Sequence, residues 1–232
     1  MSKQLILYLF IFSMMSCSSQ ETFSQNEGIV TEHLYMFRPG DTIEVKLRVL
    51  YRNNQTIQEV PQLNIVEDSS GKRTFTKILH YSYLDPGKNV CYNYRNFSDT
   101  AKVIKRYSNI DSVRIKGGWN FYSNKDFQYN SSTSLQDTVI NGINYSRIRL
   151  DKDINGIGIY FHLYLRCDKK GTLIKYFKPI SDKIGCPIVR IDTYEQNNLT
   201  ISHEIEFVSD KLSQEEVKVL ETWERNAEKQ LK

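Results

Sequence analysis

Long apolar runs are missing from this chain of 232 residues. The first one, residues 5–12, has eight residues, and a helix of that length would cover only about 12 Å of a hydrocarbon core roughly 30 Å thick. A later run, residues 157–165, is interrupted by Gly158 and His162. The sequence therefore predicts no membrane-spanning helix.

A strong excess of one charge is also missing. The 31 basic residues are nearly balanced by 27 acidic ones, and the two kinds are interspersed along the chain. Nucleic-acid binders usually gather lysine and arginine on one face or in one stripe. The charge pattern therefore excludes a nucleic-acid partner.

Motifs that carry chemistry are scarce. None of the four histidines is spaced from another as a pair of zinc ligands on one element. His203 lies on the apolar side of a predicted strand, as a core histidine does, although the fold could bring it near His162 at a metal. No G-x-S-x-G elbow or phosphate-binding glycine loop is present. We expect a non-catalytic protein without cofactors, while two carboxylates brought together by the fold would leave no trace in the sequence.

One segment matches the first half of a calcium-binding loop. Asp151, Asp153 and Asn155 place oxygen ligands at alternate positions, and Gly156 supplies the sharp bend. The twelfth position, which should hold a bidentate glutamate, is His162. The missing ligand favours a polar hairpin loop, so the first three residues are only a weak candidate for a metal site.

The N-terminus has the three parts of a signal peptide: Lys3, the apolar run, and the small or flexible residues 13–16. Cys17 follows, and a polar spacer comes after it. In these features the chain resembles bacterial lipoproteins of the Bacteroidota type. The resemblance implies that residues 1–16 are removed, that the Cys17 thiol carries diacylglycerol, and that residues 17–28 form a tether. Membrane lipid would then be a partner, in the cell envelope and at the outer membrane.

Three further cysteines are Cys91, Cys167 and Cys186. An odd number excludes complete pairing. Cys167 and Cys186 both lie near the ends of predicted strands and could form a disulfide in an oxidising envelope, whereas buried free thiols are an equally good interpretation.

Alternation with a period of two residues is the dominant pattern. Every second residue is apolar in residues 43–51, and residues 201–207 repeat the pattern. Asn141-Gly142 is typical of a tight hairpin turn. The chain therefore predicts a mainly β fold, an antiparallel meander that forms a sandwich or a half-barrel. Further strands are predicted at residues 73–84, 110–116, 137–140, 143–150, 157–167, 172–178 and 187–194.

Helices are expected in two places. Ser213 and Glu216 form a capping box that opens a C-terminal α-helix. The face of this helix that we expect to be apolar consists of Val217, Leu220, Trp223 and Ala227. A second short helix is predicted at residues 98–107.

The expected domain boundaries follow from these elements. The β domain would span residues 29–212 and the C-terminal helix residues 213–232. A run of serine and threonine at residues 130–134 predicts a linker, which could divide the β domain in two.

Aromatic residues are enriched, with 15 tyrosines and 11 phenylalanines. Their densest stretch lies at residues 92–129. Such rings could stack on sugars, but in β proteins they more often fill the core as cross-strand pairs. We favour the core interpretation.

Four segments in which Asp precedes Ser or Thr and then an apolar residue resemble acceptor sites of the O-glycosylation system of Bacteroidota. The resemblance implies glycans on the hydroxyls of Thr42, Thr100, Ser112 and Thr138.

These features predict a membrane-anchored envelope lipoprotein with a non-catalytic structural or assembly role. The alternative is a glycan- or lipid-binding module, and the partners would be a glycan or another envelope protein besides the membrane. A lipid carrier would show an apolar cavity under the C-terminal helix, and a glycan binder would expose Trp119 and neighbouring rings in a row.

Overall fold

The computed structural model describes residues 26–68, 71–110, 127–154, 156–169, 174–209 and 211–229. The predicted signal peptide lies outside these ranges, and so do Cys17, Ser112, Trp119 and Asn155. The predicted strand at residues 110–116 also falls outside them, except for Ile110.

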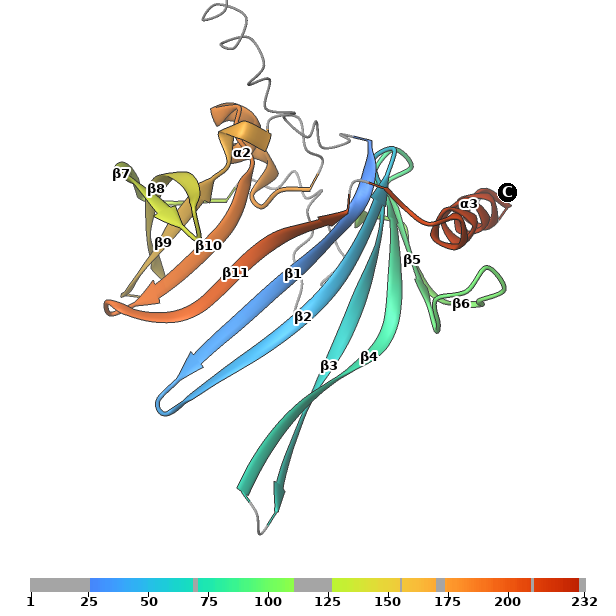
Figure 1. The fold of residues 1–232 in the computed structure, drawn as a ribbon, viewed down its shortest axis with the longest axis horizontal. Helices are drawn as coiled ribbons and strands as arrows, with labels where there is room; N and C mark the ends of the chain where they lie inside the picture. Colours follow the sequence, from blue (N-terminus) through green and yellow to red (C-terminus); the bar gives the residue numbers. More distant parts are fainter. Residues whose placement is uncertain are drawn as a thin grey trace, which may run out of the picture.

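Eleven strands form one sheet in which all neighbours are antiparallel (Figure 1). They are β1 (Glu27–Arg38), β2 (Asp41–Arg52), β3 (Gln55–Asp68), β4 (Gly71–Asp85), β5 (Val90–Tyr94), β6 (Val103–Tyr107), β7 (Ser131–Ile140), β8 (Ile143–Ile154), β9 (Ile157–Leu165), β10 (Ile188–Glu195) and β11 (Asn198–Ser209). The mainly β meander predicted from the sequence is confirmed.

The strand order is β6-β5-β4-β3-β2-β1-β11-β10-β9-β8-β7. The first and last strands therefore pair at the centre, while β6 and β7, which follow each other in the sequence, form opposite edges. One hydrophobic cluster unites Val49 and Cys91 from one half of the sheet with Leu150 and Leu163 from the other. The sheet must therefore curve so that its halves share a core. We call the face with this core the inner face, and the opposite one the outer face.

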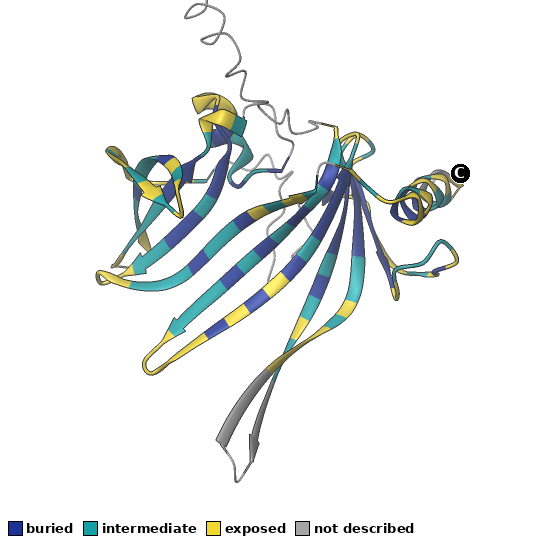
Figure 2. Ribbon diagram, in the orientation of Figure 1, coloured by how far each residue is buried: buried dark blue, intermediate teal, exposed yellow. Residues whose placement is uncertain are grey.

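Strand β2 shows how the sequence builds these faces. Ile43, Val45 and Leu47 are buried on the inner face, and they alternate with the exposed Glu44 and Lys46 on the outer face. Figure 2 shows the resulting bands of buried and exposed residues along the strand. Burying one such side chain contributes roughly 1.5 to 3 kcal/mol, so the alternation fixes which face turns inward.

The C-terminal helix, α3 (Gln214–Lys229), is also confirmed. Its capping box has formed, because the Ser213 amide donates to Glu216 Oε2 at 2.7 Å and the Glu216 amide donates to Ser213 Oγ at 3.3 Å. Val219, Leu220 and Trp223 are buried, whereas Val217 is only half-buried. Val219 thus takes the place we expected for Val217.

Helix α3 packs on the outer face, above β2 to β5. Leu50 on β2 joins its buried cluster. On either side of this apolar contact, Glu216 pairs with Arg48, and Glu221 Oε1 lies 2.9 Å from Arg52 Nη1. The salt bridges lie at the rim, so the apolar contact supplies most of the stabilisation.

The helix predicted at residues 98–107 is wrong. Residues 103–107 form β6, which pairs with β5. Lys102, Lys105 and Arg106 suit the outside of a helix, but they also suit an edge strand that must stay in water. Backbone pairing with β5 therefore makes this segment a strand and not a helix.

Two further predictions need correction. Residues 131–134 of the expected linker form the first part of β7, so the sheet continues through them. The expected strand at residues 172–178 contributes, in its described part, a single bridge between Tyr176 and Ile188. It then turns at Phe177, with φ 43°, into the short helix α2 (Lys178–Ile184).

Candidate functional site

The outer face carries a network of charged and aromatic side chains across β9, β10 and β11, centred on Asp192. This carboxylate is 2% exposed. It accepts hydrogen bonds from Ser202 Oγ at 2.6 Å, from Tyr164 Oη at 2.8 Å and from Arg190 Nε at 3.0 Å. Burial, followed by the charge of Asp192, raises the pKa of Tyr164, so its phenol stays protonated as the donor. The network joins three strands, and Arg190 extends it to Glu204 on β11, with Nη1 and Oε2 3.4 Å apart.

A second contact on this face joins β2, β1 and β11 through His33. Its Nδ1 lies 3.1 Å from Glu44 Oε1, and its Nε2 lies 2.8 Å from Glu206 Oε2. The hydrogen bond with His33 lowers the pKa of Glu44. Both nitrogens can donate to carboxylates only when the imidazole is protonated.

A pocket of about 340 Å³ opens where the β8–β9 hairpin meets the β10–β11 turn. We call it the hairpin pocket. Its wall includes the ring of Tyr160, which stacks on Tyr194 with centroids 4.7 Å apart and planes inclined by 6°. The Arg149 guanidinium lies 4.0 Å from the centre of the Tyr160 ring. The lining residues are Asn130, Arg149, Asp151, Lys152, Asp153, Gly158, Ile159, Tyr160, Gln196 and Asn197.

Hydrogen bonds hold the polar lining of the hairpin pocket in place. Asn130 Oδ1 accepts from the Asp153 amide at 2.9 Å, and Asp153 Oδ1 accepts from the Gly156 amide at 2.8 Å. Arg149 Nε donates to Asp151 Oδ1 at 2.8 Å, which lowers the pKa of that carboxyl. The pocket therefore places carboxyl and amide groups beside the aromatic side chain of Tyr160.

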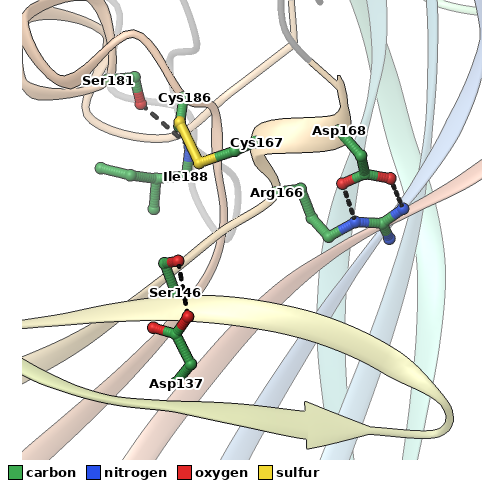
Figure 3. The surroundings of a disulfide bond; sticks show 8 residues. All are labelled: Asp137, Ser146, Arg166, Cys167, Asp168, Ser181, Cys186 and Ile188. Atoms are coloured by element: carbon green, nitrogen blue, oxygen red, sulfur yellow. Dashed lines mark hydrogen bonds and ion pairs between the residues drawn. A yellow bond between two sulfur atoms is a disulfide. The ribbon is translucent and has the colours of Figure 1, made fainter.

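The other end of the same hairpin holds a second, polar pocket of about 410 Å³, which we call the disulfide pocket. Figure 3 shows its surroundings. Cys167 and Cys186 are joined in a disulfide with a sulfur–sulfur distance of 2.11 Å. Arg166 donates two hydrogen bonds to Asp168, at 2.7 and 2.5 Å.

Polar groups of the disulfide pocket form hydrogen bonds and an ion pair with each other. Ser146 Oγ donates to Asp137 Oδ2 at 3.3 Å (Figure 3), and the charge of Arg166 is taken up by Asp168. The disulfide ties the end of β9 to the segment that leads from α2 into β10. The arrangement is that of a cross-link that stabilises the fold.

A buried carboxylate stands apart on the inner face. Glu32 is 1% exposed, and its Oε1 accepts from Tyr176 Oη at 3.2 Å and lies 3.4 Å from His203 Nδ1. Burial, and secondarily the charge of Glu32, raises the pKa of Tyr176. His203 thus lies at the core as its strand position predicts, with a carboxylate as neighbour.

The calcium-like segment is placed as a strand end and a turn. Asp151 and Asp153 both line the hairpin pocket, but their oxygens accept hydrogen bonds from Arg149, Ser131 and Gly156. Within the described ranges, no group of three or more His, Cys, Asp or Glu side chains is arranged to hold a metal ion.

Three of the four predicted glycosylation residues can be placed. Thr42 and Thr100 are exposed, and Thr138 is half-buried on β7. The Thr100 amide donates to Ser98 Oγ at 3.2 Å. Ser112 lies outside the described residues.

The dense aromatic stretch is part of the core where it is described. Tyr92 and Tyr94 are buried beneath α3. Phe127 packs on Phe161 and Phe177, with ring centroids 5.0 and 4.5 Å away. Trp119, Phe121 and Tyr122 lie outside the described residues.

Sequence reasoning named Asp151 and Asp153 but missed the aromatic and turn residues that form the hairpin pocket with them. Tyr160 sits on a largely apolar strand and Tyr194 on a strand that carries charged residues, and nothing local marks the two rings as stacked. Gln196 and Asn197 have φ values of 50° and 67°. An asparagine there is a turn signal, but it does not reveal which side chains the turn faces.

No protein-family model matches the chain, and a comparison with curated proteins finds no matching sequence. No helix in the parts of the chain that the structure describes is long and apolar enough to cross a membrane. The functional argument therefore depends on the residues themselves.

Proposed function

We propose that this protein is a lipid-anchored, non-catalytic glycan-binding protein of the bacterial envelope, and that the hairpin pocket holds the sugar. One observation carries the proposal. The ring of Tyr160, fixed by Tyr194 and Arg149, stands at the wall of a pocket whose remaining lining includes amides and carboxylates.

Sugar rings need this combination of groups. Their C–H groups contact aromatic side chains, here the edge of Tyr160, because Tyr194 and the Arg149 guanidinium cover the two faces of its ring. Their hydroxyls exchange hydrogen bonds with amides, carboxylates and guanidinium groups. The pocket volume of about 340 Å³ falls at the lower end of the range for small-ligand sites, roughly 300 to 1,000 Å³. Because Arg149 is paired with Asp151, the pocket suits an uncharged sugar unit better than an anionic one.

The lipid-binding alternative is less well supported. It would need an apolar cavity under the C-terminal helix, where the described residues form a packed cluster of Trp223, Tyr94 and Leu220. A structural or assembly role stays the second candidate, and the exposed edge strand β7 favours it.

The anchor is the other half of the proposal. It rests on the sequence alone, in which Cys17 ends a signal-like segment and opens a polar spacer. A diacylated cysteine would hold the domain at a membrane surface, where envelope glycans are abundant.

Binding can be tested with the full chain carrying Cys17→Ala, so that no acyl group contributes. Peptidoglycan fragments, lipopolysaccharide oligosaccharides and neutral polysaccharide fragments would be screened on an array, and hits titrated by calorimetry. Tyr160→Ala should weaken binding by about 1 kcal/mol, or roughly fivefold, because the aromatic edge and the hydroxyl that line the pocket are lost.

Tyr35→Ala is the matched control. Tyr35 is an outer-face ring that stacks near His33 and does not line the pocket, so its removal should leave the affinity unchanged. The proposal is wrong if no oligosaccharide binds, or if Tyr160→Ala binds as tightly as the parent chain.

A further inference from the structure

The two edges of the sheet differ in how they are protected. Edge strand β6 has five residues, and Lys105 and Arg106 on it are exposed. Short length and exposed positive charge are the usual means by which proteins prevent an edge from pairing with another chain. Edge β6 therefore has the features of a blocked edge.

Edge strand β7 has neither feature. It is ten residues long, contains no proline or lysine, and has Asp137 as its only charged residue. Residues 131–134 are exposed. Among the described strands only β8 pairs with it.

The regular part of this edge is its first half. The pairing of β7 with β8 shifts register between Leu135 and Thr138, and such a bulge interrupts the row of backbone groups that a partner strand would need. Residues 131–135 keep a continuous register with β8. Their other side offers a continuous row of donors and acceptors.

We propose that residues 131–135 of β7 pair antiparallel with the same residues of a second copy of this chain, joining two sheets edge to edge. This inference goes beyond glycan binding and does not depend on it. Serine and threonine would face each other across the junction, a pairing that β-sheets favour.

The charges suit a second copy. When the pairing is centred on Thr133, Asp137 falls opposite Tyr129 of the other copy. Centring on Ser134 instead places Asp137 opposite Ser131. No register of this kind brings like charges face to face, so the self-pairing meets no repulsion.

The pairing should be weak in solution, because five residues of each copy make a small contact. Anchoring both copies to one membrane through Cys17 would raise their effective concentration and favour the pair. We therefore expect a dimer that forms and dissociates readily.

Sedimentation of the full chain carrying Cys17→Ala, over a concentration series reaching about 1 mM, tests the dimer. Adding Thr133→Lys and Ser134→Lys places lysine opposite lysine in each of these registers. The dimer Kd should rise at least about tenfold. Lysines at the exposed Thr42 and Thr100 add the same charge away from β7 and should leave the Kd unchanged.

Cysteine cross-linking gives an independent readout that does not depend on the lysine variant folding. Under mild oxidation, Thr133→Cys or Ser134→Cys in the same background should give a covalent dimer, and Thr42→Cys should not. Cys91 is buried and does not compete. The proposal is overturned if the parent chain stays monomeric throughout, if the β7 lysine variant dimerises like its control, or if neither β7 cysteine cross-links.

Discussion

The indole ring of Trp223 on α3 stacks on the phenol ring of Tyr94 on β5, with ring centroids 3.8 Å apart and planes inclined by 6°. Trp223 is fully buried, and its Nε1 donates a hydrogen bond to the Ser98 carbonyl at 2.9 Å. One side chain thus attaches the helix both to the sheet and to the loop after β5.

Trp223→Ala should lower the free energy of unfolding by about 3 to 5 kcal/mol, because it removes the largest buried side chain of this cluster and leaves a cavity. Urea denaturation followed by circular dichroism would measure the change. Arg225→Ala, on the exposed side of the same helix, should change stability by less than about 0.5 kcal/mol. A similarly small effect for Trp223→Ala would show that α3 does not contribute to the fold.

The sequence predicted this helix because its signals are local. Ser213 and Glu216 lie three residues apart, and the apolar residues follow with helical spacing. Strand β2 was equally predictable from the sequence, since it has one buried and one solvated face. Strand β5 was missed because all five of its residues are buried, with the core on one face and α3 on the other, so alternation is absent. Only residues 137–140 of β7 were predicted as a strand, and its first part was missed for the opposite reason, since most of its residues are exposed.

Arg190–Asp192 and Arg166–Asp168 are ion pairs in which the aspartate follows the arginine by two residues. Comparing them gives a second prediction. The side chain of Asp192 beside Arg190 is 3% exposed, whereas that of Asp168 beside Arg166 is 56% exposed. Asp192→Ala should cost about 2 to 4 kcal/mol, because it leaves a half-buried guanidinium and two hydroxyl donors without their acceptor.

Asp168→Ala is the matched control and should cost no more than about 1 kcal/mol, as exposed ion pairs usually do. Both values come from chemical denaturation at neutral pH. Equal losses for the two variants would contradict the view that the Asp192 network joins β9, β10 and β11.

The candidate site was much less predictable than the fold. The hairpin pocket draws Asn130, Tyr160 and Asn197 from three separate hairpins, and only the sheet register brings them together. Asp151 was predicted as a weak candidate metal ligand. In the structure its Oδ1 instead accepts a hydrogen bond from Arg149. Neither the pocket lining nor this hydrogen bond can be inferred from the spacing of residues along the sequence.

The free thiol of Cys91 gives a pH prediction. Burial raises the pKa of this thiol from about 9 to about 12. A raised pKa in the folded state means that its contribution to stability is complete below pH 9 and is lost as the pH rises toward 12. Across that window the free energy of unfolding should fall by about 1.4 kcal/mol per pH unit for this proton.

Cys91→Ala should remove this part of the alkaline loss, and comparing the two chains by denaturation at pH 8 and pH 10 isolates it. At pH 8 a thiol reagent should label Cys91 only after unfolding, because the native thiol is protonated and covered. Rapid labelling of the native protein would contradict its burial.

The last prediction concerns the anchor. Cys17→Ala should abolish lipidation and leave the described domain folded, because the polar residues 18–22 that follow Cys17 offer little apolar surface to a core. Without acyl chains, the protein should move from the membrane fraction to the soluble envelope fraction, or remain as an uncleaved precursor.

Membrane fractionation, intact mass and thermal melting of parent and variant would decide the matter together. The parent mass should carry the added lipid, the variant should not, and the two melting curves should coincide. Ser18→Ala, one residue further on, should retain the lipid and the membrane association. A parent without lipid, together with a Cys17→Ala variant that still fractionates with membranes, would disprove the lipoprotein proposal. Because glycan binding is measured on the unlipidated chain, that outcome would leave the hairpin pocket to be judged on its own titrations.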